Sequence, residues 1–366
     1  MITGGAGFIG TNVAAHYLSN GNTVTILDNF SRTGAETNIH WLLQCYGSRV
    51  NVVRTDVRVA SRDLLESVEN ADVVIHLAAQ VAVTTSVQCP RDDFETNAIG
   101  TLNLLESVRK SKTRPILLYS STNKVYGDMH GAGVEERAGR YAFARLPYGI
   151  PETYPLSLYS PYGCSKGAAD QYVLDYARTF GLKTIVFRQS CIYGPHQHGM
   201  EDQGWIAWFA KRALERLPIT IFGDGKQTRD VLFVDDLIAA YDAAIAQIDK
   251  TTGQAYNIGG GPANVLSLSD VLALLEQCIG GRIQYRKEAW RPGDQRVFVS
   301  DTRKAMRDFA WRPTIAPNVG VLRLLDWLQS EDCPAGCVQN EAPGGAASRR
   351  GAVSNVTRSS PTSGGA

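Results

Sequence analysis

A tyrosine and a lysine stand four positions apart in the run Tyr162-Gly163-Cys164-Ser165-Lys166. If this segment is helical, the spacing places the phenol and the ammonium group on one face of the helix. Free tyrosine has a pKa of about 10, and a neighbouring positive charge stabilises the phenolate and lowers that pKa. The pair could therefore act as a general base and acid at a reacting hydroxyl. A surface helix gives the same spacing, so the pair needs a second signal.

The second signal is the hydroxyl-bearing run Ser120-Ser121-Thr122, which follows an apolar segment at 116–119 that is typical of a buried strand. In open α/β sheets, ligands bind at the carboxyl ends of the strands. These hydroxyls are therefore expected at the edge of the sheet where a ligand would lie.

A glycine-rich motif opens the chain, with Gly4, Gly7 and Gly10 in the run Thr3-Gly4-Gly5-Ala6-Gly7-Phe8-Ile9-Gly10. Such glycines allow a tight turn and a close approach of pyrophosphate, which the N-terminus of the following helix attracts. Asp28 ends the next apolar run, where a carboxylate accepts hydrogen bonds from the adenosine ribose and disfavours a 2′-phosphate. The pattern predicts NAD, although Arg32 lies close enough to weaken the preference over NADP. A structural turn and a helix cap are the alternatives.

Softer signals follow the third and fourth apolar runs. Asp56-Val57 suits the adenine edge, and Leu77-Ala78-Ala79-Gln80 stands where a dinucleotide would cross the sheet. Taken alone, Asp56 is more typical of an ordinary loop carboxylate. The cofactor-binding residues predicted so far are Gly4, Gly7, Phe8, Ile9, Gly10, Asp28, Asn29, Arg32, Asp56, Val57, Leu77, Ala78, Ala79 and Gln80.

The elements that position these residues alternate along the first half of the chain. Short apolar runs at 24–27, 50–53, 73–77 and 116–120 are separated by helical patterns such as 11–19 and 98–110. This alternation predicts an α/β fold with a doubly wound parallel sheet of the Rossmann type. Because only Met1, Ile2 and Thr3 precede the glycines, the first strand is short or the sequence as given starts late.

From about residue 191 the alternation gives way to loops and isolated helices. The pattern predicts an NAD-binding domain at 1–190 with a later return at about 226–258. A smaller interleaved α/β substrate lobe is expected mainly at 191–330. The segment 331–366 is rich in Gly, Ala, Ser, Pro and Arg and is predicted to be a disordered tail that catalysis does not need.

Composition excludes several classes of function. Across 366 residues, 37 Lys and Arg oppose 36 Asp and Glu, and the net charge of +1 gives no basis for binding nucleic acid or a membrane surface. No apolar run approaches the ~20 residues that cross a bilayer. The 7 cysteines are scattered, which indicates reduced thiols and a cytoplasmic location. Cys333 and Cys337 lie close together, but nothing near them completes a metal site, so no metal is expected.

Together, the glycine motif, the Ser-Ser-Thr run, Tyr162-x-x-x-Lys166 and the segment 223–230 resemble the extended short-chain dehydrogenase/reductases over roughly residues 1–328. That family contains NAD-dependent nucleotide-sugar epimerases, dehydratases and decarboxylases. The resemblance implies that Thr122 hydrogen-bonds a substrate oxygen and Tyr162 is the general base and acid. It also implies that Lys166 binds the cofactor ribose and lowers the pKa of Tyr162. Asn97 matches the family's helix-kinking asparagine of the active-site network, with an ordinary asparagine at a helix start as the alternative. The resemblance adds Asn97, Tyr162 and Lys166 to the predicted cofactor-binding residues.

Two features narrow the reaction. The 4,6-dehydratases have Asp-Glu directly after the threonine, whereas Asn123-Lys124 cannot act as that acid–base pair. The runs 120–128 and 160–172 resemble the CDP-tyvelose (CDP-paratose) 2-epimerases. The same resemblance extends to 38–42, 81–86, 202–205 and 294–299, while the loop Pro195-His196-Gln197-His198 departs from that pattern.

The resemblance also implies a nucleotide-sugar site. Arg229 and Arg291 match diphosphate-binding arginines, whose guanidinium groups fork onto two phosphate oxygens. Asp294 would bind a ribose hydroxyl of the nucleotide. Thr84, Gln203 and Trp205 would line the sugar pocket. Surface ion pairs for the arginines and a core position for the tryptophan are the alternatives.

The favoured interpretation is NAD-dependent epimerisation of a nucleotide-linked sugar by transient oxidation to a ketone, as in a CDP-paratose 2-epimerase. The alternatives are a UDP- or dTDP-sugar 4-epimerase and a non-catalytic NAD-sensing or scaffold protein. The intact Thr122, Tyr162 and Lys166 argue against the last of these. The resemblance further implies a homodimer in which helices at 98–110 and 163–180 form a four-helix bundle, with candidate contacts at Leu102, Leu105, Tyr172, Leu174 and Tyr176.

Overall fold

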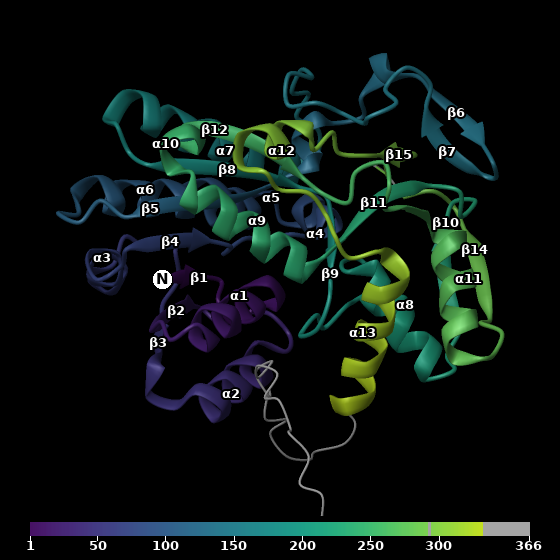
Figure 1. Ribbon diagram of the computed structural model, residues 1–366, viewed down its shortest axis with the longest axis horizontal. Helices are drawn as coiled ribbons and strands as arrows, with labels where there is room; N and C mark the ends of the chain where they lie inside the picture. The colour runs from purple at the N-terminus through teal and green to yellow at the C-terminus, as the bar shows by residue number, and fades with distance from the viewer. Residues whose placement is uncertain (292–293, 332–366) are drawn as a thin grey trace, which may run out of the picture. The chain divides into compact units, whose positions relative to one another are not determined.

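A seven-stranded parallel sheet forms the centre of the fold (Figure 1). The computed structural model describes residues 1–291 and 294–331, so the predicted tail lies outside the described residues beyond position 331. The order of the strands is β12-β8-β5-β4-β1-β2-β3, and each neighbouring pair is parallel. Their bounds are β1 Ile2–Thr3, β2 Val24–Asp28, β3 Val50–Arg54, β4 Val73–His76, β5 Ile116–Thr122, β8 Thr184–Gln189 and β12 Gln254–Ile258. The predicted α/β class is confirmed.

Helices cover both faces of this sheet because successive strand side chains point to opposite sides. In β2, Ile26 packs in a cluster with α1 and α2, whereas Leu27 packs in a second cluster with α3, α6 and α7. The helices of the first cluster are α1 Phe8–Ser19, α2 Ala35–Tyr46 and α9 Val234–Ala246. Those of the second are α3 Arg62–Glu69, α6 Gly100–Lys110 and α7 Ser160–Phe180. Strands buried on both faces explain the continuous apolar runs in the sequence.

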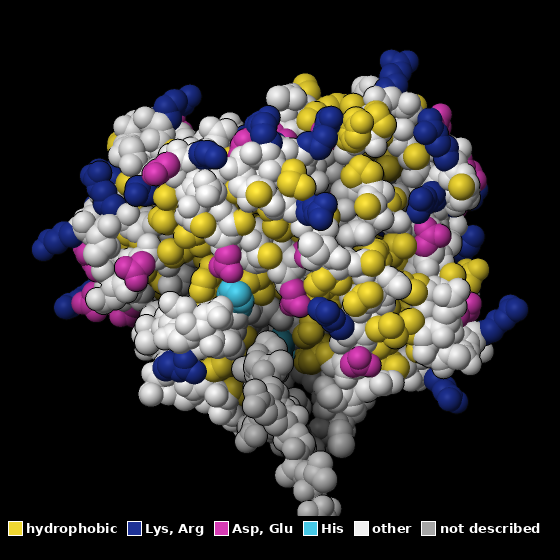
Figure 2. Space-filling view, viewed as in Figure 1, with side chains coloured by type: hydrophobic (Ala, Val, Ile, Leu, Met, Phe, Trp, Pro, Cys, Tyr) yellow, Lys and Arg dark blue, Asp and Glu magenta, His cyan; other side chains and the backbone are white. Residues whose placement is uncertain are grey.

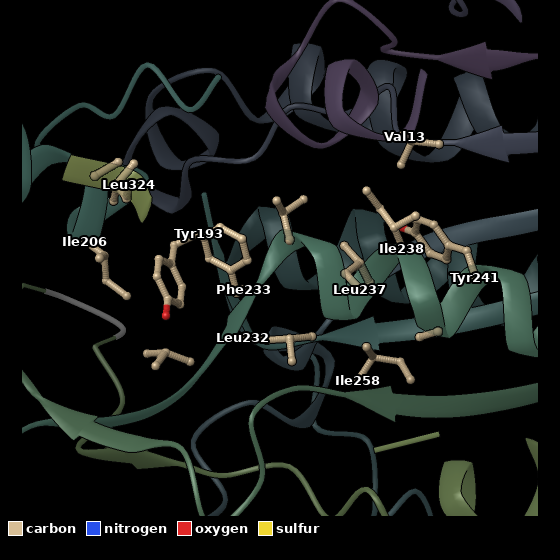
Figure 3. Packing of buried hydrophobic residues seen from close by; sticks show 14 of the residues in the cluster. Val13, Tyr193, Ile206, Leu232, Phe233, Leu237, Ile238, Tyr241, Ile258 and Leu324 are labelled. Carbon is tan, nitrogen blue, oxygen red and sulfur yellow. The ribbon is translucent and has the colours of Figure 1, made fainter. Parts of the chain in front are cut away.

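The first cluster continues from the sheet into the second half of the chain (Figure 3). Figure 3 shows Val13 of α1 beside Ile238 and Tyr241 of α9, with Phe233 of the neighbouring strand further along the same layer. The same cluster includes residues of α8 and α13 in the smaller lobe. The two halves of the described chain therefore share one hydrophobic core.

The smaller lobe is built on short strands and three helices. β11 Thr228–Phe233 pairs with β9 Cys191–Tyr193, β13 Val265–Ser267 and β15 Val297–Phe298. β10 Ile219–Phe222 pairs in parallel with β14 Tyr285–Glu288, and β6 Val134–Arg137 forms an antiparallel hairpin with β7 Arg140–Phe143. The helices of this lobe are α8 Trp205–Leu214, α11 Leu268–Ile279 and α13 Pro317–Glu331.

The remaining elements are short. They are α4 Val83–Gln88, α5 Pro90–Phe94, α10 Ile248–Thr251, α12 Arg303–Phe309, a π-helical turn η2 Glu95–Ile99, and the 3-10 turns η1 Gly47–Arg49, η3 Asn123–Tyr126 and η4 His130–Ala132. Among the described helices, none is long and apolar enough to cross a membrane. On the face in Figure 2, positive and negative side chains are interspersed, as the near-zero net charge leads one to expect.

Candidate active site

A cavity of about 520 Å³ lies where the order of the strands reverses. The chain leaves β1 for β2 and β3 on one side, while β4 and β5 lie on the other, which opens a crevice at the carboxyl ends of these strands. All of the predicted site residues line this cavity except Gln80 and Asn97. Side chains far apart in the sequence therefore meet at one place.

The glycine motif shapes one wall of this cavity. Gly4 has φ +66°, and a Cβ there would lie 2.7 Å from the backbone nitrogen of Ala78. A Cβ on Gly10 would lie 2.5 Å from the carbonyl oxygen of Gly4, so α1 can pack directly on the turn only with glycine at this position. Because α1 begins at Phe8, its unpaired first-turn N–H groups and positive dipole end lie at the cavity wall. These features fit a pyrophosphate.

The end of β2 provides a carboxylate suited to a ribose. Asp28 accepts hydrogen bonds from the N–H groups of Ala6, at 3.0 Å, and Phe30, at 2.8 Å. Its two oxygens retain lone pairs for the hydroxyls of an adenosine ribose. Burial raises the pKa of Asp28, and these backbone hydrogen bonds oppose the rise. The residues at this end of the cavity therefore fit the adenosine half of NAD.

Asp56 lies next to this ribose position. Asn29 donates a hydrogen bond to its carboxylate at 2.9 Å, and Arg58 forms an ion pair with it at 2.8 Å. Burial raises the pKa of Asp56, but these hydrogen bonds outweigh it, and the pKa lies below its ordinary value. Arg32, by contrast, donates to the side chain of Gln203 across the cavity.

The three residues predicted to be catalytic converge from two elements. Thr122 is the last residue of β5, while Tyr162 and Lys166 lie one turn apart on α7. Tyr162 is hydrogen-bonded to Thr122. The Nζ atom of Lys166 donates to the carbonyl of Ser120 and lies 4.3 Å from the ring centroid of Tyr119. The tyrosine–lysine pair and the hydroxyl-bearing run at the end of β5 therefore contribute to one group of side chains.

Burial opposes charge on both members of the tyrosine–lysine pair. It raises the pKa of Tyr162 to about 12, although the hydrogen bond with Thr122 lowers it. It also lowers the pKa of Lys166 to about 7, although the nearby carboxylates of Asp170 and Asp93 raise it. We expected a permanently charged lysine to lower the pKa of Tyr162. In the protein without cofactor, burial outweighs that effect and the pKa of Tyr162 is raised. The phenol keeps its proton at neutral pH.

Asn97 lies behind the cavity wall. It is buried in the π-helical turn η2, accepts a hydrogen bond from the N–H of Gln80 at 2.9 Å, and donates to the Gln80 carbonyl at 3.1 Å. Its amide also donates to the hydroxyl of Ser165 at 3.0 Å, between Tyr162 and Lys166 on α7. Asn97 therefore connects the segment after β4 to the catalytic helix without lining the cavity.

The other end of the cavity contains two arginines among several carboxylates. Arg229 lies on β11, and Arg291 stacks over Phe222 with its guanidinium carbon 3.7 Å from the ring centroid. Arg291 pairs with Asp202 at 3.1 Å, and the hydroxyl of Thr84 donates to the same carboxylate at 3.1 Å. These groups can bind a diphosphate.

The candidates for a sugar pocket, Thr84, Gln203 and Trp205, all line the cavity. Trp205 begins α8, and its indole N–H hydrogen-bonds the thiol of Cys191. Gln203 and Asp294 line the cavity, whereas Pro292 and Gly293, of the motif around Arg291, lie outside the described residues.

Several cavity residues were not among the sequence candidates. Lys124 is half-buried in the wall, and its pKa falls to about 8 because of desolvation and the neighbouring charge of Arg229, while Asp294 raises it. The sequence could have indicated Lys124, because it lies just after Thr122 at the end of β5. Cys191 could have been found in the same way, because it lies just after the end of β8. Phe222 lies where the strand pattern had broken down, so no local signal indicated it.

The parallel sheet, the glycine turn and the cavity at the strand ends are those of a dinucleotide-binding enzyme. Residues 1–259 match the family described as the NAD dependent epimerase/dehydratase family. The chain is 44% identical over 337 residues to the CDP-paratose 2-epimerase of Salmonella typhi, covering 90% of this chain and 99% of that relative. It is 32% identical to the dTDP-glucose 4,6-dehydratase of Salmonella typhimurium, covering 89% of this chain and 91% of that relative.

Among solved structures, the UDP-glucuronic acid 4-epimerase of Bacillus cereus, in complex with UDP-glucuronic acid and NAD, superposes with a TM-score of 0.78 at 28% identity. The match covers 90% of this chain and 98% of that chain. The chain belongs to the NAD dependent epimerase/dehydratase family, and its cofactor is NAD.

Proposed function

We propose that the protein inverts C2 of a 3,6-dideoxyhexose attached to CDP, interconverting CDP-paratose and CDP-tyvelose. The observation that carries this proposal is the convergence of Thr122, Tyr162 and Lys166 with Arg229 and Arg291 in one cavity. The choice of sugar and nucleotide is supported by the 44% identity to the CDP-paratose 2-epimerase over nearly the whole of that relative.

The catalytic side chains handle the proton. Tyr162 accepts the proton of the sugar hydroxyl and later returns it, while Thr122 hydrogen-bonds the same oxygen and holds it at the phenol. Lys166 binds the cofactor ribose and, when protonated, stabilises the phenolate. When bound, NAD supplies a hydride acceptor, then a hydride donor, and in its oxidised form a positive charge that favours the phenolate.

The end of the cavity that contains Arg229 and Arg291 holds the substrate while its sugar ring turns. Arg229 and Arg291 bind the diphosphate, which anchors the nucleotide as the ketone presents its other face. Asp294 accepts a hydrogen bond from the nucleotide ribose, and Thr84, Gln203 and Trp205 surround the sugar. We assign cofactor binding to 1–190 with 226–258, and substrate binding mainly to 191–330.

Dehydration is disfavoured by the residues that follow Thr122. Asn123 and Lys124 both line the cavity, and neither is a carboxylic acid that could protonate a leaving hydroxyl. Asn123 and Lys124 therefore support epimerisation rather than dehydration.

We further propose a homodimer built on α6 and α7 in the cytoplasm. On α7, Tyr172 is 52% exposed and Phe180 is 40% exposed, while Leu102 on α6 and Leu174 on α7 are half-buried. Of the other candidate contacts, Leu105 and Tyr176 pack in the core of this protomer. Light scattering at micromolar concentration should give twice the mass of one chain, and the mass of a monomer would refute the dimer.

The activity is tested with a panel of nucleotide sugars. The protein is incubated separately with CDP-paratose, UDP-glucose and dTDP-glucose, and the products are identified by NMR. Conversion of the CDP sugar alone supports the proposal. Inversion at C4 of a UDP or dTDP sugar would replace it with a 4-epimerase, and no conversion of any sugar would favour a non-catalytic NAD-binding protein.

A further inference from the structure

The loop between β9 and α8, residues 194–204, lies along the cavity and contributes His196, His198 and Gln203 to its lining. Within this loop, the run 195–198 departs from the 2-epimerase pattern, whereas 202–204 belongs to a run that resembles it. Two asparagines of the sheet domain donate hydrogen bonds to consecutive backbone carbonyls of this loop. Asn12 on α1 donates to the carbonyl of Pro195 at 2.8 Å, and Asn38 on α2 donates to the carbonyl of His196 at 3.4 Å.

Asn38 joins this loop to the glycine motif itself. Its amide nitrogen also donates to the carbonyl of Ala6 at 3.1 Å, and its amide oxygen lies 3.3 Å from the Nε2 of His198. The side chain is only 2% exposed. One buried amide thus holds the turn that would surround the pyrophosphate and the loop that faces it across the cavity.

The backbone of the loop is held in an unfavourable conformation. His196 has φ +62°, in the left-handed region that a non-glycine residue rarely adopts unless its surroundings impose it. Its ring packs between Trp41, with ring centroids 4.2 Å apart, and Trp327, at 5.3 Å. A Cβ on Gly34 would lie 2.0 Å from the ring of His198, so this ring needs glycine beside it. The surroundings therefore fix the loop from several sides.

The far end of the loop is tied to both lobes. Gln203 accepts a hydrogen bond from Arg32, which follows the ribose-binding Asp28. Asp202 accepts a hydrogen bond from Thr84 and pairs with Arg291 of the smaller lobe. Any bound dinucleotide would lie beneath a segment connected to the sheet domain at four residues, namely Asn12, Arg32, Asn38 and Thr84.

We propose that Asn12 and Asn38 are positioning residues that retain the cofactor by holding this loop closed over the dinucleotide site. The reason for retention rests on the proposed function. An epimerase that works by transient oxidation must keep its reduced cofactor and its ketone together until the hydride returns. A loop that opened faster than turnover would release both.

The dissociation rate of the cofactor tests this directly. The full-length protein is loaded with NADH and mixed with a large excess of NAD⁺, and the loss of bound-NADH fluorescence is followed by stopped flow. Losing the hydrogen bond to the loop should speed dissociation about five- to tenfold in Asn12→Ala and in Asn38→Ala. Asn12→Ala also removes the bond to the carbonyl of Phe8, and Asn38→Ala also removes the contacts with Ala6 and His198. Asn22→Ala is the matched control, because Asn22 is exposed and bonds only the carbonyl of Tyr17 at its own helix end. Its rate should equal that of the wild type.

Melting temperatures separate retention from general loss of structure. Asn12→Ala, at a half-buried site, should leave the melting temperature of the cofactor-free protein close to that of the wild type while the NADH dissociation rate rises. If Asn38→Ala fails to fold, Gly34→Ala provides the second variant, because its Cβ displaces the ring of His198. Dissociation rates within twofold of the wild type in Asn12→Ala and the second variant would overturn the proposal.

The readout needs no sugar substrate. Faster NADH dissociation in these variants, combined with no epimerisation by the wild type, would sustain the retention role and refute the proposed function. Unchanged NADH dissociation in these variants, combined with epimerisation by the wild type, would refute the retention role and support the proposed function. In an active wild type, free NADH captured by pyruvate and lactate dehydrogenase during turnover should stay near zero, and it should accumulate in Asn12→Ala.

Discussion

Replacing Lys166 with methionine tests how burial controls the active site. Burial lowers the pKa of Lys166 from 10.5 to about 7. Because the unfolded chain binds this proton more tightly than the folded protein does, a charged Lys166 destabilises the fold. The destabilisation is fully present below about pH 7 and disappears as the pH rises towards 10.5. The difference between these two pKa values corresponds to an upper limit of about 5 kcal/mol.

The destabilisation by Lys166 decreases as the pH rises, by an amount that can be measured. By the same linkage, the cost of Lys166 is about 4 kcal/mol at pH 7 and about 2 kcal/mol at pH 9. Methionine fills a similar volume without a charge, so Lys166→Met should be more stable than the wild type at pH 7. That advantage should shrink by about 2 kcal/mol at pH 9.

The assay is urea denaturation of the cofactor-free proteins at the two pH values. The free energies of unfolding are compared between wild type and Lys166→Met, with the exposed Lys183→Met as the control. A difference between wild type and Lys166→Met that stays constant from pH 7 to pH 9 would refute the reasoning. It would mean that Lys166 keeps its proton in the folded protein across that range, as it does in the unfolded chain.

Three further substitutions test separate parts of the site. Tyr162→Phe should lower the turnover rate about 10²- to 10⁴-fold by NMR assay while NAD titrations stay near wild type, and near-normal turnover would exclude this residue as the base. Asp28→Asn should weaken NAD binding about tenfold and reduce the preference for NAD over NADP in calorimetric titrations, whereas an unchanged preference would remove Asp28 from the ribose site. Arg229→Met should weaken CDP binding about 10- to 100-fold without affecting NAD binding, and equal CDP affinity would place the diphosphate elsewhere.

The parallel sheet and one edge of the site could be predicted from the sequence because both depend on local patterns. Buried strands are continuous apolar runs, and the residues that follow them must lie at one edge of the sheet. Thr122 and Asp28 were found in this way. The same logic cannot tell which way a side chain faces. Gln80 and Asn97 were expected to bind the cofactor, yet both lie off the cavity and hydrogen-bond each other behind its wall.

Long-range contacts and the depth at which a side chain is buried could not be predicted from the sequence. The hydrogen bond from Asn12 to the Pro195 carbonyl joins residues 183 positions apart, and no periodic pattern indicates such a pairing. The pKa values of Tyr162 and Lys166 depend on how deeply both groups are buried, which their spacing on a helix does not reveal. The motif indicated the candidate groups, while their burial in the fold sets the direction in which their pKa values shift.

The central claim is that C2 of a CDP-linked sugar is inverted by removal and return of one hydride. CDP-paratose labelled with deuterium at C2 is incubated with the enzyme in ordinary water, and the product is analysed by NMR and mass spectrometry. The expected product is CDP-tyvelose that retains the deuterium at C2. Failure to convert the CDP sugar, or a product that has lost the deuterium to solvent, would contradict it.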